Sequence, residues 1–114
     1  MKDFNGEIQY KDKTYKMVFN LNVMEAIQEV YGTIDEWARL TDGQSGEPNA
    51  KAVIYGFTEM INEGIDIANE ENGTDEKPLT LKQVGRLITD VGLKEATRRM
   101  NDTVINSTKD EKNV

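Results

Sequence analysis

The sequence predicts an α+β fold that is mainly helical: a single domain with an N-terminal β-hairpin packed on about five helices. Three observations predict it: alternating apolar and polar residues within 6–19, several helix-capping sequences, and a long apolar stripe over 49–68. A chain of 114 residues has the length of one domain. We expect that domain to cover residues 1–114, with an ordered core at 4–107 and a polar tail at 108–114 that frays.

The hairpin prediction follows from a period of two residues. Apolar side chains occupy alternate positions in both runs, which are joined by the polar, turn-compatible segment 11–14. The alternating residues are Ile8 and Tyr10 in the first run, and Tyr15, Met17 and Phe19 in the second. Because an isolated hairpin is marginal in water, we expect its apolar face to lie on helices.

Helix-capping sequences predict where three of the helices begin. Segments 22–25, 33–36 and 80–83 each place a capping side chain three residues before Glu or Gln. Gly32 and Gly92 are suitably placed to end two of these helices. The expected core stripe after residue 80 is Leu81, Val84, Ile88 and Val91. The stripe expected for a last helix, over about 93–106, is Leu93, Ala96, Thr97, Met100 and Val104.

Residues 49–68 predict the longest helix, which the polar loop 69–78 follows. Its apolar stripe is Ala50, Val53, Ile54, Phe57, Met60, Ile61, Ile65 and Ala68. Gly56 and Gly64 interrupt the helix, and each costs about 1 kcal/mol relative to Ala in a helix interior. We expect close packing against a neighbour at both glycines, with an earlier helix end at Gly64 as the alternative.

The composition excludes several kinds of chemistry. The chain has no Cys and no His, so thiolate nucleophiles, imidazole bases, disulfides and Cys- or His-ligated metals are excluded. A carboxylate acid/base pair needs a substrate cleft that so small a helical domain has little material to build. We therefore expect no catalytic residues, no cofactor and no enzyme activity. Glu59 and Glu63, one helical turn apart, are better explained as a solvated face than as a metal site.

Charge and hydropathy indicate the compartment and exclude some partners. The net charge is −7, and the basic cluster at 82–99 is interrupted by acids, so we expect no nucleic-acid binding. The N-terminus has no apolar signal region, and no apolar run is long enough to span a membrane. We expect a cytoplasmic protein.

Some apolar residues miss the centres of the core stripes. In one interpretation a small bundle buries both sides of its helices, or these residues are singly exposed. In the other they form a surface that receives an amphipathic partner helix. The candidate partner-binding residues are Tyr55, Ile67, Met100, Val104 and Ile105.

The order of segments resembles a known family. A short hairpin leads into residues 19–32 (FNLNVMEAIQEVYG) and 33–37 (TIDEW); an amphipathic helix then ends near 62–65 (NEGI), before 79–88 (LTLKQVGRLI) and a terminal helix. This pattern, over about residues 4–107, resembles the tail assembly chaperones of long-tailed bacteriophages, prophages and gene transfer agents.

The resemblance implies a non-enzymatic function. Such chaperones bind the long helical tape-measure protein and keep it soluble until tail tube subunits polymerise around it, and they tend to self-associate. We therefore expect the tape-measure protein, and with it the tail tube protein, as partners. The family has no fixed binding motif, so no site residue is carried over. A structural tail or connector component of a phage particle, or a small protein-binding regulator, are the alternative functions.

Overall fold

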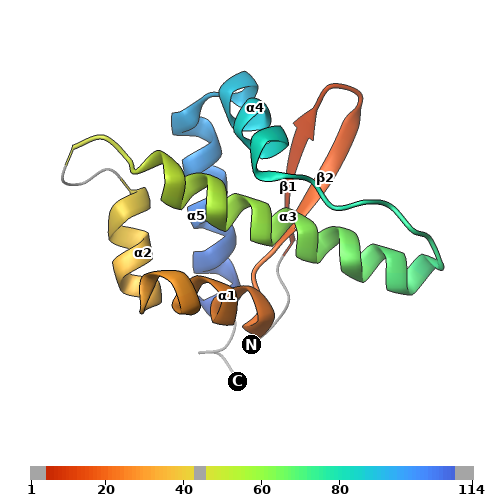
Figure 1. Cartoon of the computed structure of the whole chain (residues 1–114), viewed down its shortest axis with the longest axis horizontal. Helices are drawn as coiled ribbons and strands as arrows, with labels where there is room; N and C mark the ends of the chain where they lie inside the picture. The colour runs from red at the N-terminus through yellow and green to blue at the C-terminus, as the bar shows by residue number, and fades with distance from the viewer. Residues whose placement is uncertain (1–4, 43–45, 110–114) are drawn as a thin grey trace.

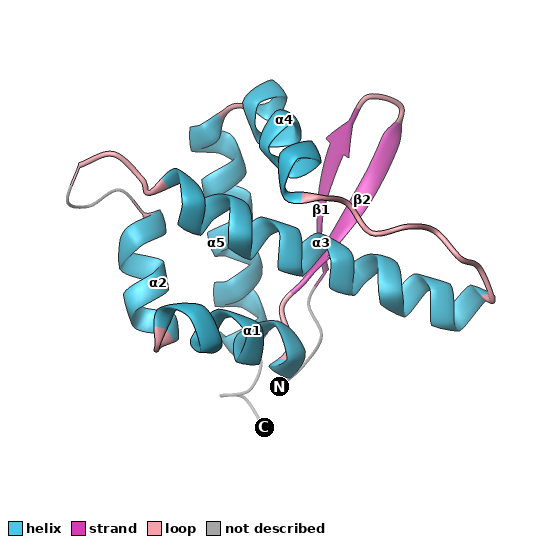
Figure 2. Cartoon of the chain, in the orientation of Figure 1, coloured by secondary structure: helices cyan, strands magenta, loops and turns pink. Residues whose placement is uncertain are grey.

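The computed structural model describes residues 5–42 and 46–109, and it confirms the predicted fold class (Figures 1 and 2). A two-stranded antiparallel sheet precedes five helices within one domain. The elements are β1 (Asn5–Tyr10), β2 (Lys13–Val18), α1 (Leu21–Tyr31), α2 (Ile34–Thr41), α3 (Ala50–Asn72), α4 (Leu81–Val91) and α5 (Leu93–Lys109).

The hairpin forms in the expected place with a tighter turn. Ile8 pairs with Tyr15, and Tyr10 pairs with Lys13, so only two residues form the loop. Helix α3 packs on β2, and α5 packs on β1. The neighbouring residues Met17 and Val18 are both buried, although successive side chains point to opposite faces of a sheet. Both faces of the hairpin are therefore covered at this end, where alternation alone predicted one.

Both glycines inside α3 are sites of close packing. A Cβ atom on Gly56 would lie within the indole ring of Trp37, and one on Gly64 would meet the Lys16 carbonyl oxygen. The Trp37 Nε1–H donates to the Ala52 carbonyl at 3.0 Å, which fixes the ring against α3. Close packing at these glycines is thus confirmed, and the helix continues past Gly64.

Two helix boundaries differ from the sequence prediction. Helix α1 begins earlier, because the Asn20 side chain, and not that of Asn22, accepts the Val23 amide at 3.2 Å. Helix α3 extends to Asn72 and ends at Gly73, whose φ of 65° favours glycine. The expected loop at 69–78 was therefore placed four residues too early, because a polar helix end carries no core stripe.

The caps of α2 and α4 are as predicted. Thr33 accepts the Glu36 amide at 3.0 Å. Thr80 and Gln83 form a reciprocal capping box, in which the Gln83 amide donates to Thr80 Oγ1 and the Thr80 amide donates to Gln83 Oε1. Gly92, with φ of 104°, ends α4. These local signals were reliable because the hydrogen bonds they describe lie within one helical turn.

The core faces of α4 and α5 differ from the predicted stripes at one end of each. Leu81 and Leu93, each in the first turn of its helix, are exposed, at 55% and 41%. Leu87 on α4, and Thr103 and Ser107 on α5, are buried instead. The remaining predicted stripe residues are buried or half-buried. Helix α5 continues to Lys109, and residues 110–114 of the expected frayed tail lie outside the described residues.

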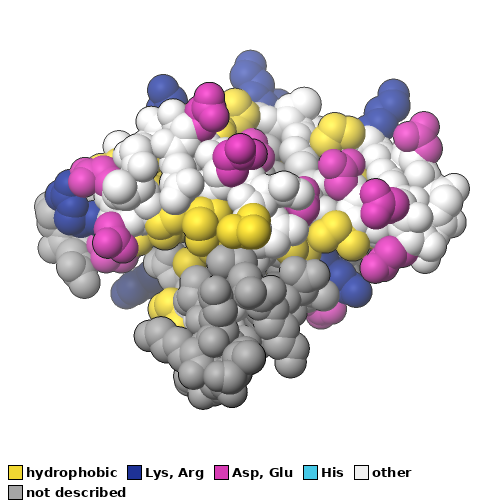
Figure 3. All heavy atoms as spheres, turned by 90° about the horizontal axis from the view of Figure 1, so that it is seen from below, with side chains coloured by type: hydrophobic (Ala, Val, Ile, Leu, Met, Phe, Trp, Pro, Cys, Tyr) yellow, Lys and Arg dark blue, Asp and Glu magenta, His cyan; other side chains and the backbone are white. Residues whose placement is uncertain are grey.

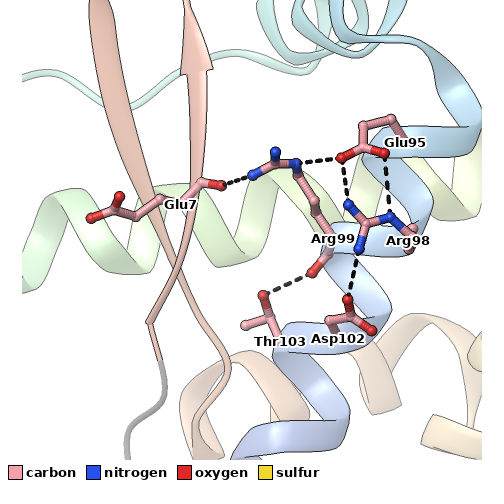
Figure 4. Close-up of polar contacts among 6 residues, drawn as sticks. All are labelled: Glu7, Glu95, Arg98, Arg99, Asp102 and Thr103. Carbon is pink, nitrogen blue, oxygen red and sulfur yellow. Dashed lines mark hydrogen bonds and ion pairs between the residues drawn. The ribbon is translucent and has the colours of Figure 1, made fainter.

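An exposed polar network joins α5 to β1 (Figure 4). Arg99 donates to the Glu7 carbonyl at 2.9 Å and to the Glu95 carboxylate at 2.8 Å. Arg98 bridges Glu95 and Asp102, at 2.6 and 3.2 Å. Hydrogen bonds from Arg98 and then Arg99 lower the pKa of Glu95 below its usual value. Both arginines are therefore neutralised within the molecule.

Of the helices in the described part of the chain, none combines the length and apolarity needed to cross a membrane.

Candidate protein-binding groove

An open groove of about 950 Å³ lies over the first half of α3. Helices α1 and α4 lie on either side of that half of α3, and both contact it (Figure 1). The C-terminal end of α1 forms one wall, α4 forms the other, and Tyr10 of the hairpin also lines the groove. The groove residues are Tyr10, Val30, Tyr31, Lys51, Ile54, Tyr55, Leu81, Lys82, Gly85, Arg86, Thr89 and Asp90.

The floor of the groove is aromatic and rigidly held. The rings of Tyr31 and Tyr55 pack edge to face, with centroids 5.9 Å apart. The Tyr55 hydroxyl donates to the Ala26 carbonyl of α1 at 3.0 Å, which ties α3 to α1. Burial raises the pKa of both tyrosines above the usual value. Both rings therefore present apolar surface to the groove.

The walls expose large aliphatic side chains. Val30 on α1 is 52% exposed and Leu81 on α4 is 55% exposed. Between Leu81 and Thr89 the wall of α4 is low, because Gly85 has no side chain: a Cβ there would make an ordinary contact of 3.7 Å with Ile54 Cδ1. The groove thus has space where a side chain would fit without strain.

The rim of the groove is basic, although the chain as a whole is acidic. Lys51, Lys82 and Arg86 are exposed along it, against one acid, Asp90. Among the described residues, none of these three basic side chains forms an ion pair. Past Tyr10 and Arg86, a second hollow of about 380 Å³ continues the groove toward the hairpin tip and adds Lys11 and Lys13.

The five residues predicted to bind a partner do not form one surface. Tyr55 lines the groove, and none of the other four does. Ile67 is half-buried near the end of α3, Val104 is half-buried against the core, and Ile105 is 58% exposed on α5. Met100 is fully buried and so offers no surface to a partner in this structure. It packs in the core because α5 turns this face toward the rest of the bundle.

Sequence reasoning missed most of the groove. The apolar periodicity of α4 predicts Leu81 in the core stripe, and no pattern in the sequence singles out Val30. A signal was nevertheless present: Leu81, Gly85 and Thr89 share one face of α4 at spacings of four residues, with Lys82 and Arg86 beside it.

The carboxylates of α3 serve a structural purpose in the fold. The Glu63 carboxylate accepts hydrogen bonds from the side-chain Nδ2 groups of Asn20 and Asn22, at 2.7 and 3.1 Å, and so ties α3 to the start of α1. Burial first, and then the charge of Glu63, raise the pKa of Glu59. Within the described residues, no three Asp, Glu, His or Cys side chains gather to hold a metal ion. Figure 3 shows one face of the molecule, on which acidic side chains lie above and beside several apolar ones.

Comparison with known proteins identifies no relative: the chain matches no protein-family model, no curated protein and no solved structure.

Proposed function

We propose that this protein is a non-enzymatic tail assembly chaperone of a long-tailed bacteriophage or a related prophage. It binds the helical tape-measure protein in the bacterial cytoplasm and keeps that client soluble until the tail tube forms around it. The observation that carries the proposal is the open apolar groove of about 950 Å³, whose walls expose Val30 and Leu81.

The groove has the properties that a reversible holding function requires. Half-exposed aliphatic walls and an aromatic floor offer modest hydrophobic contact to a client. The net charge of −7 keeps a protein with such a surface soluble. Together these features support binding followed by release.

The polar groups of the groove support contact more than catalysis. The Tyr55 hydroxyl already donates to a backbone carbonyl, and the charged groups lie on the exposed rim. Proton transfer by a side chain needs a free group held close to the reacting atoms, and neither the engaged Tyr55 hydroxyl nor the exposed rim provides one. The tail tube protein and a second copy of this chain are further partners in the proposal.

Co-expression tests the proposal directly. The protein is produced in the bacterial cytoplasm with the long helical protein encoded just downstream of it, and the soluble fraction of that client is measured. We expect the client to become soluble and to co-purify with the chaperone. A client that stays equally insoluble would contradict the proposal.

Purified particles provide a second measurement. A chaperone is absent from the finished particle, whereas a structural tail or connector component is present in stoichiometric amounts. Finding the protein in particles at the stoichiometry of a tail component would therefore overturn the proposed function in favour of a structural one.

A further inference from the structure

We infer that the groove between α1, α3 and α4 takes one amphipathic α-helix whose apolar stripe is flanked by carboxylates. The inference specifies the kind of segment that the proposed chaperone binds. It rests on the proposed function only for the identity of the protein that supplies the helix. Length, charge and the fixed tyrosines of the groove each support it.

The length of the groove suits a helix. Along α4 the groove extends from Leu81 to Asp90, which is roughly 14 Å of helix axis. That distance equals between two and three turns of a partner helix bound in the groove. Such a helix presents apolar residues at i, i+3, i+4 and i+7. The absent side chain at Gly85 leaves the middle of this wall low enough for a bulky side chain of the partner.

The charge of the rim selects among such helices. Lys51 lies in the first turn of α3, and Lys82 and Arg86 lie on the α4 wall, so the basic groups come from two of the three helices that form the groove. In a chain of net charge −7, this local reversal of sign repels segments with basic flanks and attracts acidic ones. Since no ion pair among the described residues neutralises these three side chains, their charges remain for a partner.

The aromatic residues argue against a nucleic acid as the occupant. Single-stranded nucleic acid needs free aromatic faces on which bases stack. Tyr31 and Tyr55 instead pack against each other, and the Tyr55 hydroxyl is tied to α1. Asp90 in the groove and the net charge of the chain also oppose phosphate binding.

Designed peptides test the inference without the natural client. Two labelled peptides of about 18 residues, long enough for partial helicity, carry the same leucine stripe with either glutamates or lysines beside it. Binding to the full chain is measured by fluorescence anisotropy. We expect the glutamate peptide to bind about tenfold more tightly, because each of three exposed charge pairs contributes a small factor.

Paired variants locate the binding site. Arg86→Glu should weaken binding of the glutamate peptide severalfold and strengthen that of the lysine peptide, whereas the matched control Lys94→Glu, on α5, should change neither. Gly85→Leu should fill the groove and weaken binding of both peptides, whereas Gly85→Ala should leave binding nearly unchanged. Thermal unfolding monitored by circular dichroism establishes that each variant is folded.

Three results would overturn the inference. Equal affinity for the two peptides would remove the charge argument, and unchanged binding by Arg86→Glu and Gly85→Leu would place the site elsewhere. Displacement of the glutamate peptide by a single-stranded oligonucleotide would identify a nucleic acid as the occupant. If sedimentation velocity shows that the chain self-associates and that this association releases the peptide, the occupant is a second copy of the chain.

The same variants separate this inference from the proposed function. If the glutamate peptide binds in the groove but the tape-measure protein stays insoluble, the inference stands and the chaperone function fails. If the client becomes soluble equally well with wild type and Gly85→Leu, the chaperone function stands and the groove is not the site.

Discussion

Helices α4 and α5 each carry a pair of basic residues, and the two pairs lie in opposite environments. On α5, Arg98 and Arg99 are neutralised by Glu95 and Asp102, and Arg99 also reaches the backbone of β1. On α4, Lys82 and Arg86 stand beside an apolar groove with no ion pair among the described residues.

The difference teaches which charges hold the fold and which remain for a partner. The sequence shows all four as members of one basic cluster, and composition cannot separate them. The hydrogen-bond acceptors of the α5 arginines lie one helical turn away on α5 or across on β1. The basic residues of α4 instead border the open groove. The closed α5–β1 interface and the open α4 groove can be compared by experiment.

The largest expected effect is at the closed interface. Gly6→Ala would place a Cβ within 2.2 Å of Thr103 Oγ1, an atom that already donates to the Arg99 carbonyl. Because Thr103 is buried and β-branched, it has little freedom to move. We expect a loss of about 1–3 kcal/mol in the free energy of unfolding, measured by urea denaturation. No change in stability would show that β1 and α5 are less closely packed.

The matched substitution in the open groove should have the opposite sign. In Gly85→Ala the new Cβ makes only an ordinary contact with Ile54. Since Ala is favoured over Gly inside a helix, we expect a gain of about 0.5–1 kcal/mol in the same denaturation experiment. A loss of stability would contradict the open space that the groove requires.

A smaller, pH-dependent effect is expected for the Glu59 carboxylate of α3. Burial and Glu63 raise the pKa of Glu59, so its ionisation destabilises the fold as pH rises from the usual carboxylate range through the raised value. We expect Glu59→Gln to increase stability by about 0.2–0.5 kcal/mol at neutral pH, the size of a like-charge pair one turn apart. Urea denaturation at several pH values should show this gain disappearing below the usual pKa. A gain that persists there would implicate a cause other than charge.

The smallest effect, with the opposite pH dependence, is expected for Glu95 on α5. Its pKa is lowered by Arg98 and Arg99, so its contribution is present above the usual carboxylate pKa and lost as pH falls through the lowered value. Glu95→Gln should therefore be slightly less stable than wild type at neutral pH and equal to it in strong acid. Because the group is exposed, added salt should reduce the difference in thermal unfolding. A salt-independent difference would indicate lost packing instead.

Local signals in the sequence predicted most of the fold. The capping segments 33–36 and 80–83, the stops at Gly32 and Gly92, and the close approaches at Gly56 and Gly64 all act within a turn or through a missing side chain. Such features depend on residues close together in the sequence or, at the glycines, on the absence of a side chain. They can therefore be read without knowing the topology.

The candidate site could not be predicted to the same extent. Tyr55 lines the groove, but Met100 is buried, and Leu81, assigned to the core, is exposed. Periodicity identifies the apolar face of a helix and does not say how much of that face a neighbour covers. For Leu81 and Val30 the coverage depends on where α4 and α1 cross α3, which is a property of the packed bundle.

By itself, the sequence determined the α+β class, the starts of α2 and α4 and the absence of thiol and imidazole chemistry, because each depends on residue identity or short-range spacing. Only the tertiary structure decided that Arg98 and Arg99 are neutralised while Lys82 and Arg86 are not, and that α1, α3 and α4 leave a groove. Those outcomes depend on distances between segments far apart in the chain, which packing of the whole core fixes.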